Sequence, residues 1–137
     1  MKAFQVYLNF DGNCRDAMTF YQQSVGAELD VQTFGEAPMD MPPGSENRVM
    51  HARLTKGDAV LMASDSMPGH PFSQGTNFSV NIDCDTTEEL DRYYAALAQG
   101  GKASMEPQDT FWGARFGMLT DKFGVNWMFN CQLDKHG

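Results

Sequence analysis

Apolar and polar residues alternate along several short stretches of this chain, as they do in strands that bury one face. The clearest example is the stretch 109–130, where two alternating runs, 113–120 and 125–130, flank a turn at 121–124. Alternation or a short β-favouring run also predicts strands at 3–10, 29–34, 47–55, 59–64, 77–83 and 102–106. The other strands are therefore expected to extend the sheet that this hairpin begins.

Two further stretches carry apolar residues at the spacing of an amphipathic helix. The first helix is expected to start at Asn13, a good N-cap residue, and to stop at Gly26. The second is expected to start at Thr86, because Thr86 and Glu89 have the spacing of a capping box. It ends at the glycine pair 100–101. The two helices are expected to cover the apolar face of the sheet.

The order of these elements repeats along the chain with a period of about 70 residues. Each half contains a strand, a helix and three further strands. Pro- and Gly-rich stretches predict a loop at 35–46 and a linker at 67–75. The sequence therefore predicts an α+β fold, in which one domain over 1–137 contains two βαβββ modules, 1–66 and 76–137.

Composition is that of a globular domain, with 42% hydrophobic and 20% charged residues. A formal net charge of -8 argues against nucleic acid and anionic membranes as partners. No apolar run is long enough to span a membrane, and Asp11 comes too early for a signal peptide. The three cysteines, Cys14, Cys84 and Cys131, lack CxxC spacing, which favours a cytoplasmic protein without disulfides or a zinc–thiolate site.

The polar side of the sheet is the expected binding surface. We expect the apolar sets to face the helices, including the set Ala114, Phe116 and Met118. The opposite face then carries Gln5, Tyr7, Asn9, His51, Arg53, Met62, Ser64, Asn77, Ser79, Asn81, Arg115, Asn126 and Met128. It holds two arginines and no carboxylate, which favours a small polar or anionic ligand. Alternatively, the arginines pair with loop carboxylates such as Asp65 or Asp109, and the face holds only water.

Three other residues have both a functional and a structural interpretation. His51 is a candidate general base, because histidine changes protonation near neutral pH; the alternative is a structural hydrogen bond to a neighbouring strand. Trp112 is a candidate cavity wall, or else a core or dimer contact. Cys14 follows a helix start, but no basic partner is evident, so we expect an unreactive thiol.

Four segments of the chain resemble one known family. The segments YLNFDGNCRDAMTFYQ, VMHARL, LMASD and DTFWGARFGMLTDKFGVNW are similar to the PhnB-like branch of the vicinal oxygen chelate superfamily. That superfamily includes glyoxalase I, extradiol dioxygenases, and bleomycin- and fosfomycin-resistance proteins. The resemblance implies a cupped mixed sheet around a cavity, helices on the outer face, and usually a homodimer. Some relatives are labelled demethylubiquinone methyltransferases, but no Gly-rich strand-to-helix loop for S-adenosylmethionine is visible in this chain.

The resemblance also implies where a metal would bind. The superfamily holds a divalent metal with His, Glu or Gln at positions that correspond here to Gln5, Met62, Asn77 (or Phe78, one residue on) and Met128. Only Gln5 is a plausible ligand, because thioethers do not hold hard divalent cations. We therefore expect neither the usual metal nor another cofactor.

Two functions follow from these observations. The first is binding of a small polar or anionic molecule, with the candidate ligand-binding residues Gln5, Tyr7, Asn9, Arg53, Ser64, Asn77, Trp112 and Arg115. The alternative is an enzyme of lyase, isomerase or dioxygenase type that acts on a small metabolite. It would use His51 as general base or a metal at a non-standard position.

Overall fold

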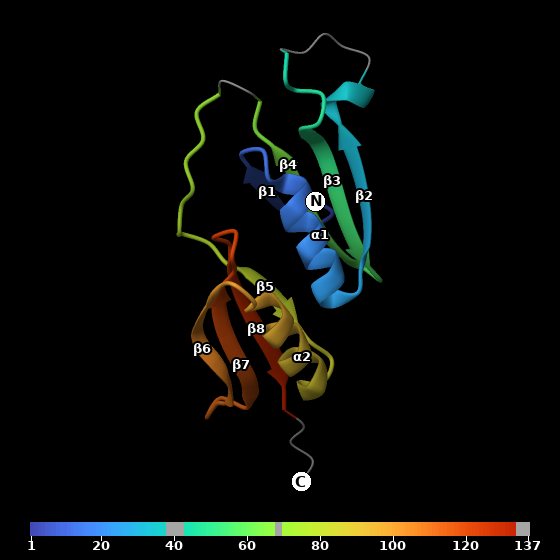
Figure 1. The fold of residues 1–137 in the computed structure, drawn as a ribbon. Coiled ribbons are helices and arrows are strands. Elements are labelled where there is room, and N and C mark those ends of the chain that lie inside the picture. Colours follow the sequence, from blue (N-terminus) through green and yellow to red (C-terminus); the bar gives the residue numbers. More distant parts are fainter. Residues whose placement is uncertain (38–42, 68–69, 134–137) are drawn as a thin grey trace. The chain divides into compact units, whose positions relative to one another are not determined.

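The computed structural model describes residues 1–37, 43–67 and 70–133 and has an α+β fold (Figure 1). The chain forms two compact units, Met1–Ser73 and Gln74–Gly137, which we call the first and the second module. The boundary falls inside the stretch 67–75, where the sequence predicted a linker. The closure of both sheets into one cup stays a prediction.

The first module is a four-stranded mixed sheet with one α-helix. Its strand order is β1-β4-β3-β2; β1 and β4 are parallel, and the other pairs are antiparallel. A short 3-10 helix spans the last residue of the predicted strand 29–34 and the first residues of the predicted loop 35–46. The elements are β1 (Val6–Phe10), α1 (Cys14–Val25), β2 (Glu28–Thr33), η1 (Phe34–Glu36), β3 (Val49–Lys56) and β4 (Ala59–Asp65).

The second module repeats this topology. Its strand order is β5-β8-β7-β6, again with one parallel pair, β5 and β8. The elements are β5 (Val80–Asp83), α2 (Thr87–Leu97), β6 (Lys102–Asp109), β7 (Ala114–Thr120) and β8 (Asn126–Gln132). The predicted pair of βαβββ modules is therefore confirmed.

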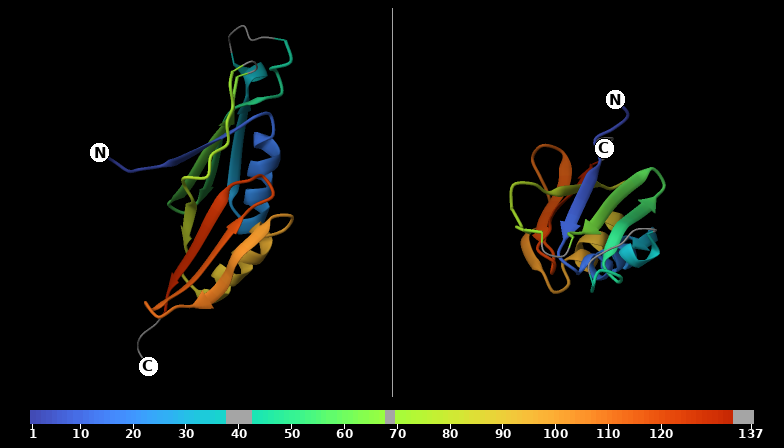
Figure 2. Two further views of the ribbon diagram at one scale, coloured as in Figure 1. Left: turned by 90° about the vertical axis from the view of Figure 1, so that its left-hand side faces the viewer. Right: turned by 90° about the horizontal axis from the view of Figure 1, so that it is seen from above.

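In each module the helix lies on one face of the sheet, and the core lies between them (Figure 2). In the second module the ring of Tyr94 packs on Phe129 with the centroids 5.2 Å apart. Gly117 makes room for it, since a Cβ there would be 3.2 Å from that ring. Among the described residues, no helix combines the length and the apolar character needed to cross a membrane.

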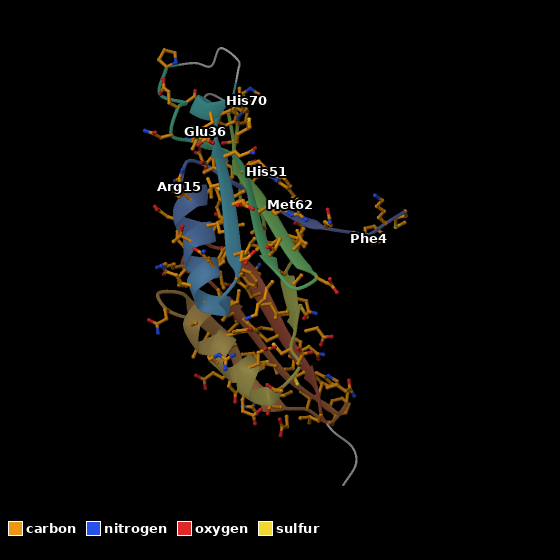
Figure 3. All side chains as sticks on the ribbon, turned by 90° about the vertical axis from the view of Figure 1, so that its right-hand side faces the viewer. Phe4, Arg15, Glu36, His51, Met62 and His70 are labelled. Carbon is orange, nitrogen blue, oxygen red and sulfur yellow. The ribbon has the colours of Figure 1, made fainter. Side chains whose placement is uncertain are left out.

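Several predicted strand boundaries were wrong. β1 starts at Val6, not at residue 3, because its register with β4 begins at the pair Val6 and Leu61. Phe4 is consequently 92% exposed on the segment that leads away from the sheet (Figure 3). β5 likewise starts at 80, not 77, whereas β6 continues to Asp109 because that residue pairs with Arg115 of β7.

The predicted orientation of β7 was also wrong. Its register with β8 pairs Gly117 with Phe129 and Leu119 with Trp127. Phe129 and Trp127 are both buried in the core. The set Arg115, Gly117 and Leu119 therefore faces α2. Phe116 and Met118 lie on the opposite face, where Met118 is 37% exposed. Chain alternation defined the two sets correctly, but the packing of Tyr94 against Gly117 decides which set faces the helix.

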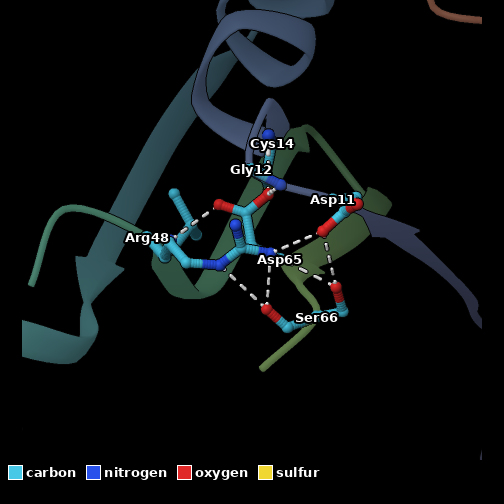
Figure 4. Close-up of polar contacts among 7 residues, drawn as sticks. Asp11, Gly12, Cys14, Arg48, Asp65 and Ser66 are labelled. Carbon is cyan, nitrogen blue, oxygen red and sulfur yellow. Dashed lines mark hydrogen bonds and ion pairs between the residues drawn. The ribbon is translucent and has the colours of Figure 1, made fainter. Parts of the chain in front are cut away.

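The buried carboxylate of Asp65 joins three elements of the first module (Figure 4). Its Oδ1 accepts hydrogen bonds from the backbone N–H groups of Gly12 at 2.8 Å and Cys14 at 3.0 Å, and its Oδ2 accepts from Val49 N–H at 2.8 Å. Asn13 holds the N-cap position as predicted but makes no side-chain cap bond. Asp65 therefore supplies from β4 the cap that the sequence assigned to Asn13.

We expect Asp65→Asn to lower the free energy of unfolding by about 2–3 kcal/mol, because an amide NH₂ cannot accept from a buried N–H. Asp58→Asn in the exposed β3–β4 turn removes the same charge and is the matched control. The control should stay within about 0.5 kcal/mol of wild type. Urea unfolding measures both, and equal losses in the two variants would contradict the role given to Asp65.

Candidate functional site

The face of the first module's sheet that lies opposite α1 carries most of the predicted site residues. We call it the open face of the first module. The strand register places Tyr7, Met62, Arg53 and Asp30 in one row across β1, β4, β3 and β2. Figure 3 shows His51 and Met62 on this part of the module. The described residues of this face are Tyr7, Asn9, Glu28, Asp30, Gln32, His51, Arg53, Thr55, Val60, Met62 and Ser64.

Tyr7 and His51 are in direct contact on this face. The hydroxyl oxygen of Tyr7 lies 3.3 Å from Nδ1 of His51, and the two ring centroids are 5.9 Å apart. If the tyrosine O–H donates, His51 is the tautomer with its proton on Nε2. In that arrangement one imidazole nitrogen is held by the protein and the other remains for a ligand. Tyr7 itself is 43% exposed, so the pair is accessible to a small molecule.

Arg53 and Asp30 lie across from each other on β3 and β2. Both are exposed, and neither makes an ion pair with another residue in the described part of the chain. The prediction that this face has no carboxylate was therefore wrong. The signal was present in the sequence, because Glu28, Asp30 and Gln32 alternate with the less exposed residues Leu29 and Val31.

Arg115 is not part of an open face. It lies on the side of β7 that faces α2, where its Nε donates to Oδ1 of Asp91 at 2.8 Å and its Nη1 to Oδ1 of Asp109 at 3.2 Å. The hydrogen bonds to Asp91 and Asp109 raise the pKa of Arg115 above its usual value, against the opposite effect of burial. The alternative of pairing with Asp109 was thus correct, and Arg115 is held by the protein's own carboxylates.

The remaining candidates lie away from this cluster. Gln5 precedes β1 and is exposed, and Asn77 is an exposed residue ahead of β5 in the second module. Trp112 lies in the β6–β7 turn, is 51% exposed, and makes ring contacts with Phe111 and Phe116. The first-module sheet therefore gathers five of the nine predicted site residues on its open face: Tyr7, Asn9, His51, Arg53 and Ser64.

The residues at the inherited metal positions do not fit a hard divalent cation. Met62 and Met128 lie on the open faces of β4 and β8 and offer thioethers, while Mg²⁺ and Mn²⁺ require oxygen ligands. Over the described ranges, no group of three or more His, Cys, Asp or Glu side chains has the arrangement of a metal site. We therefore derive no reaction through a divalent metal.

The three cysteines are free and buried. Burial raises the pKa of Cys14 to about 12, and the nearby Asp65 carboxylate adds to the effect. Burial likewise raises the pKa of Cys84 to about 12. Both thiols therefore stay protonated at neutral pH, which agrees with the expectation of an unreactive Cys14.

The paired βαβββ modules define the fold of the vicinal oxygen chelate superfamily. A glyoxalase/bleomycin resistance protein/dioxygenase family enzyme from Burkholderia phytofirmans PsJN has this fold, with a TM-score of 0.63 and 21% identity over 96% of this chain and 100% of that one. The protein PA1353 from Pseudomonas aeruginosa is more similar, with a TM-score of 0.84 and 41% identity over 96% of this chain and 100% of that one.

The PhnB protein from Bacillus cereus is 30% identical, with a TM-score of 0.76 over 95% of this chain and 99% of that one. A family model described as 3-demethylubiquinone-9 3-methyltransferase matches residues 2–130. The chain therefore belongs to this family, the PhnB-like branch of the superfamily. The resemblance noted in the sequence is confirmed.

Proposed function

We propose that the open face of the first module binds a small polar or anionic molecule. The observation that carries this proposal is the exposed Arg53, which has no ion pair among the described residues and shares a face with the Tyr7–His51 pair. A guanidinium offers several N–H donors in a planar fork, which suits a carboxylate or a phosphate. Tyr7, Asn9 and Ser64 supply further polar groups on β1 and β4.

Methyl transfer, which the family description names, finds less support in the residues. A helix N-terminus can hold an anionic cofactor group through its free N–H groups. At the start of α1, the N–H groups of Cys14 and of Gly12, two residues earlier, already donate to Asp65. In α2, the side chain of Thr86 accepts from the N–H of Glu89. Side chains of the protein itself thus accept N–H groups at or next to the start of the helix in both modules.

We expect carboxylates or phosphate to raise the melting temperature, and Arg53→Gln to abolish this effect. Because Arg53 is exposed, solvent weakens its contact with an anion to about 1 kcal/mol. At a few times its dissociation constant, a bound anion stabilises the folded protein by about 1 kcal/mol, which raises the melting temperature of a domain of this length by about 4 °C. A thermal-shift screen with inorganic phosphate and a panel of mono- and dicarboxylates measures it.

Arg92→Gln is the matched control, since Arg92 is an exposed residue of α2 whose guanidinium lies over the ring of Tyr93. It removes the same charge and should keep the full response to anions. The proposal fails if no compound in the panel shifts the melting temperature, or if the two variants lose the response equally. Equal loss in the two variants would assign the effect to overall charge.

The second candidate is an enzyme acting on a small metabolite, with His51 as general base. The Tyr7–His51 contact favours it in the other tautomer, in which Nδ1–H donates to the Tyr7 hydroxyl oxygen, because the imidazole is then held in one orientation with Nε2 unprotonated. We expect incubation with the strongest stabilising compound to yield a product in wild type but not in His51→Gln, as detected by mass spectrometry. A compound that is bound but recovered unchanged would leave binding as the function.

We also propose that the protein forms a homodimer of about 31 kDa, twice the 15.3 kDa chain. Phe111 is 97% exposed and makes an edge-to-face contact with Trp112, and aromatic residues are enriched at interfaces. Light scattering should give the dimer mass for wild type and the monomer mass for Phe111→Asp. A monomeric wild type at micromolar concentration would contradict the proposal.

The free cysteines and the net charge of -8 support a cytoplasmic location without nucleic acid or membrane as a partner.

A further inference from the structure

Three methionines form a row across the second module's sheet. Met105 of β6 pairs with Met118 of β7, and Met118 pairs with Met128 of β8. Residues paired in this way point to the same side of a sheet, and here that side is the one opposite α2, although the register of β6 with β7 shifts on both sides of Met105. All three side chains are at least partly exposed, with Met118 at 37%. We call this set the methionine row.

We propose that the methionine row binds a soft monovalent cation, Cu(I), through its three thioether sulfurs. Neighbouring strands are about 4.8 Å apart, so the outer two side chains have to lean only a few ångströms toward the central one. Methionine has three rotatable side-chain bonds and a polarizable sulfur, which suits this adjustment. Thioethers are soft ligands and select Cu(I) over Mg²⁺, Ca²⁺ or Mn²⁺.

The contrast with the other side of the same strands supports a chemical role for the row. The helix-facing residues Leu119, Trp127 and Phe129 are 1%, 4% and 0% exposed and form the core of the module. The methionine row lies outside that core, since Met118 is 37% exposed and Met105 and Met128 are partly exposed. Asn81 of β5 pairs with Met128 and so continues the line of the methionine row across the sheet; its side chain is uncharged. No cationic side chain of the row therefore repels a metal ion.

The site uses residues of the second module alone, so it does not depend on the proposed anion site of the first. It also accounts for Met128 at a position where the superfamily has a hard ligand. The exchange of an oxygen or nitrogen ligand for a thioether excludes hard cations and retains soft ones.

The test uses Ag(I), a soft cation that is not oxidised in air, as the probe for the Cu(I) site. Full-length protein is labelled with ¹³C in its ten methionine methyl groups and titrated with silver nitrate in chloride-free buffer. We expect the methyl signals of Met105, Met118 and Met128, assigned from single Leu variants, to shift together and to saturate at one equivalent. Mg²⁺ should leave these signals unshifted.

Met118→Leu conserves volume and therefore should fold. We expect it to weaken silver binding about tenfold or more, as loss of a metal contact commonly does. Met50→Leu, in β3 of the first module and outside the inherited metal positions, is the matched control and should bind as wild type. The proposal is overturned if the three signals do not shift, if Met118→Leu binds as tightly as wild type, or if silver goes to the buried cysteines without moving these methyl groups.

Discussion

The carboxylate of Asp65 is the interaction on which the arrangement of the first module depends. It is 5% exposed and accepts three backbone N–H groups, two from the start of α1 and one from the start of β3. Since Asp65 is the last residue of β4, one side chain fixes the start of α1 and the start of β3 to the end of β4. That fixed register in turn places Tyr7, His51 and Arg53 on one face, where their polar groups can act together.

The two modules share a topology but present different chemistry at equivalent positions of the register. Met62 pairs with Tyr7 and Arg53, whereas Met128 pairs with Asn81 and Met118. A charged and aromatic row in the first module thus corresponds to a thioether row in the second. Because strand order and pairing are the same, only the side chains distinguish the two faces. Fold alone does not assign a function to either of them.

Sequence patterns predicted much of this structure and failed at identifiable places. Alternation separated the two faces of β7, but both sets contain apolar residues, so pattern alone did not show which one packs on α2. The ring of Tyr94 occupies the space that Gly117 leaves open, and this contact turns Arg115 toward Asp91. A side chain predicted to bind an anion therefore holds a helix to its sheet. Asp30, by contrast, lies on a strand whose own alternation of exposed and less exposed residues already places its carboxylate on the open face.

The sequence by itself determined the two βαβββ modules, the starts of both helices, the family, and the polar character of Tyr7, His51 and Arg53. These follow from local periodicity, capping residues and recognisable segments, which need no knowledge of distant contacts. Only the tertiary structure decided that Asp65 caps α1, that Arg115 faces its own helix, and that Met105, Met118 and Met128 lie in one row. Each depends on strand register or on side-chain packing between residues far apart in the chain, which local pattern does not encode.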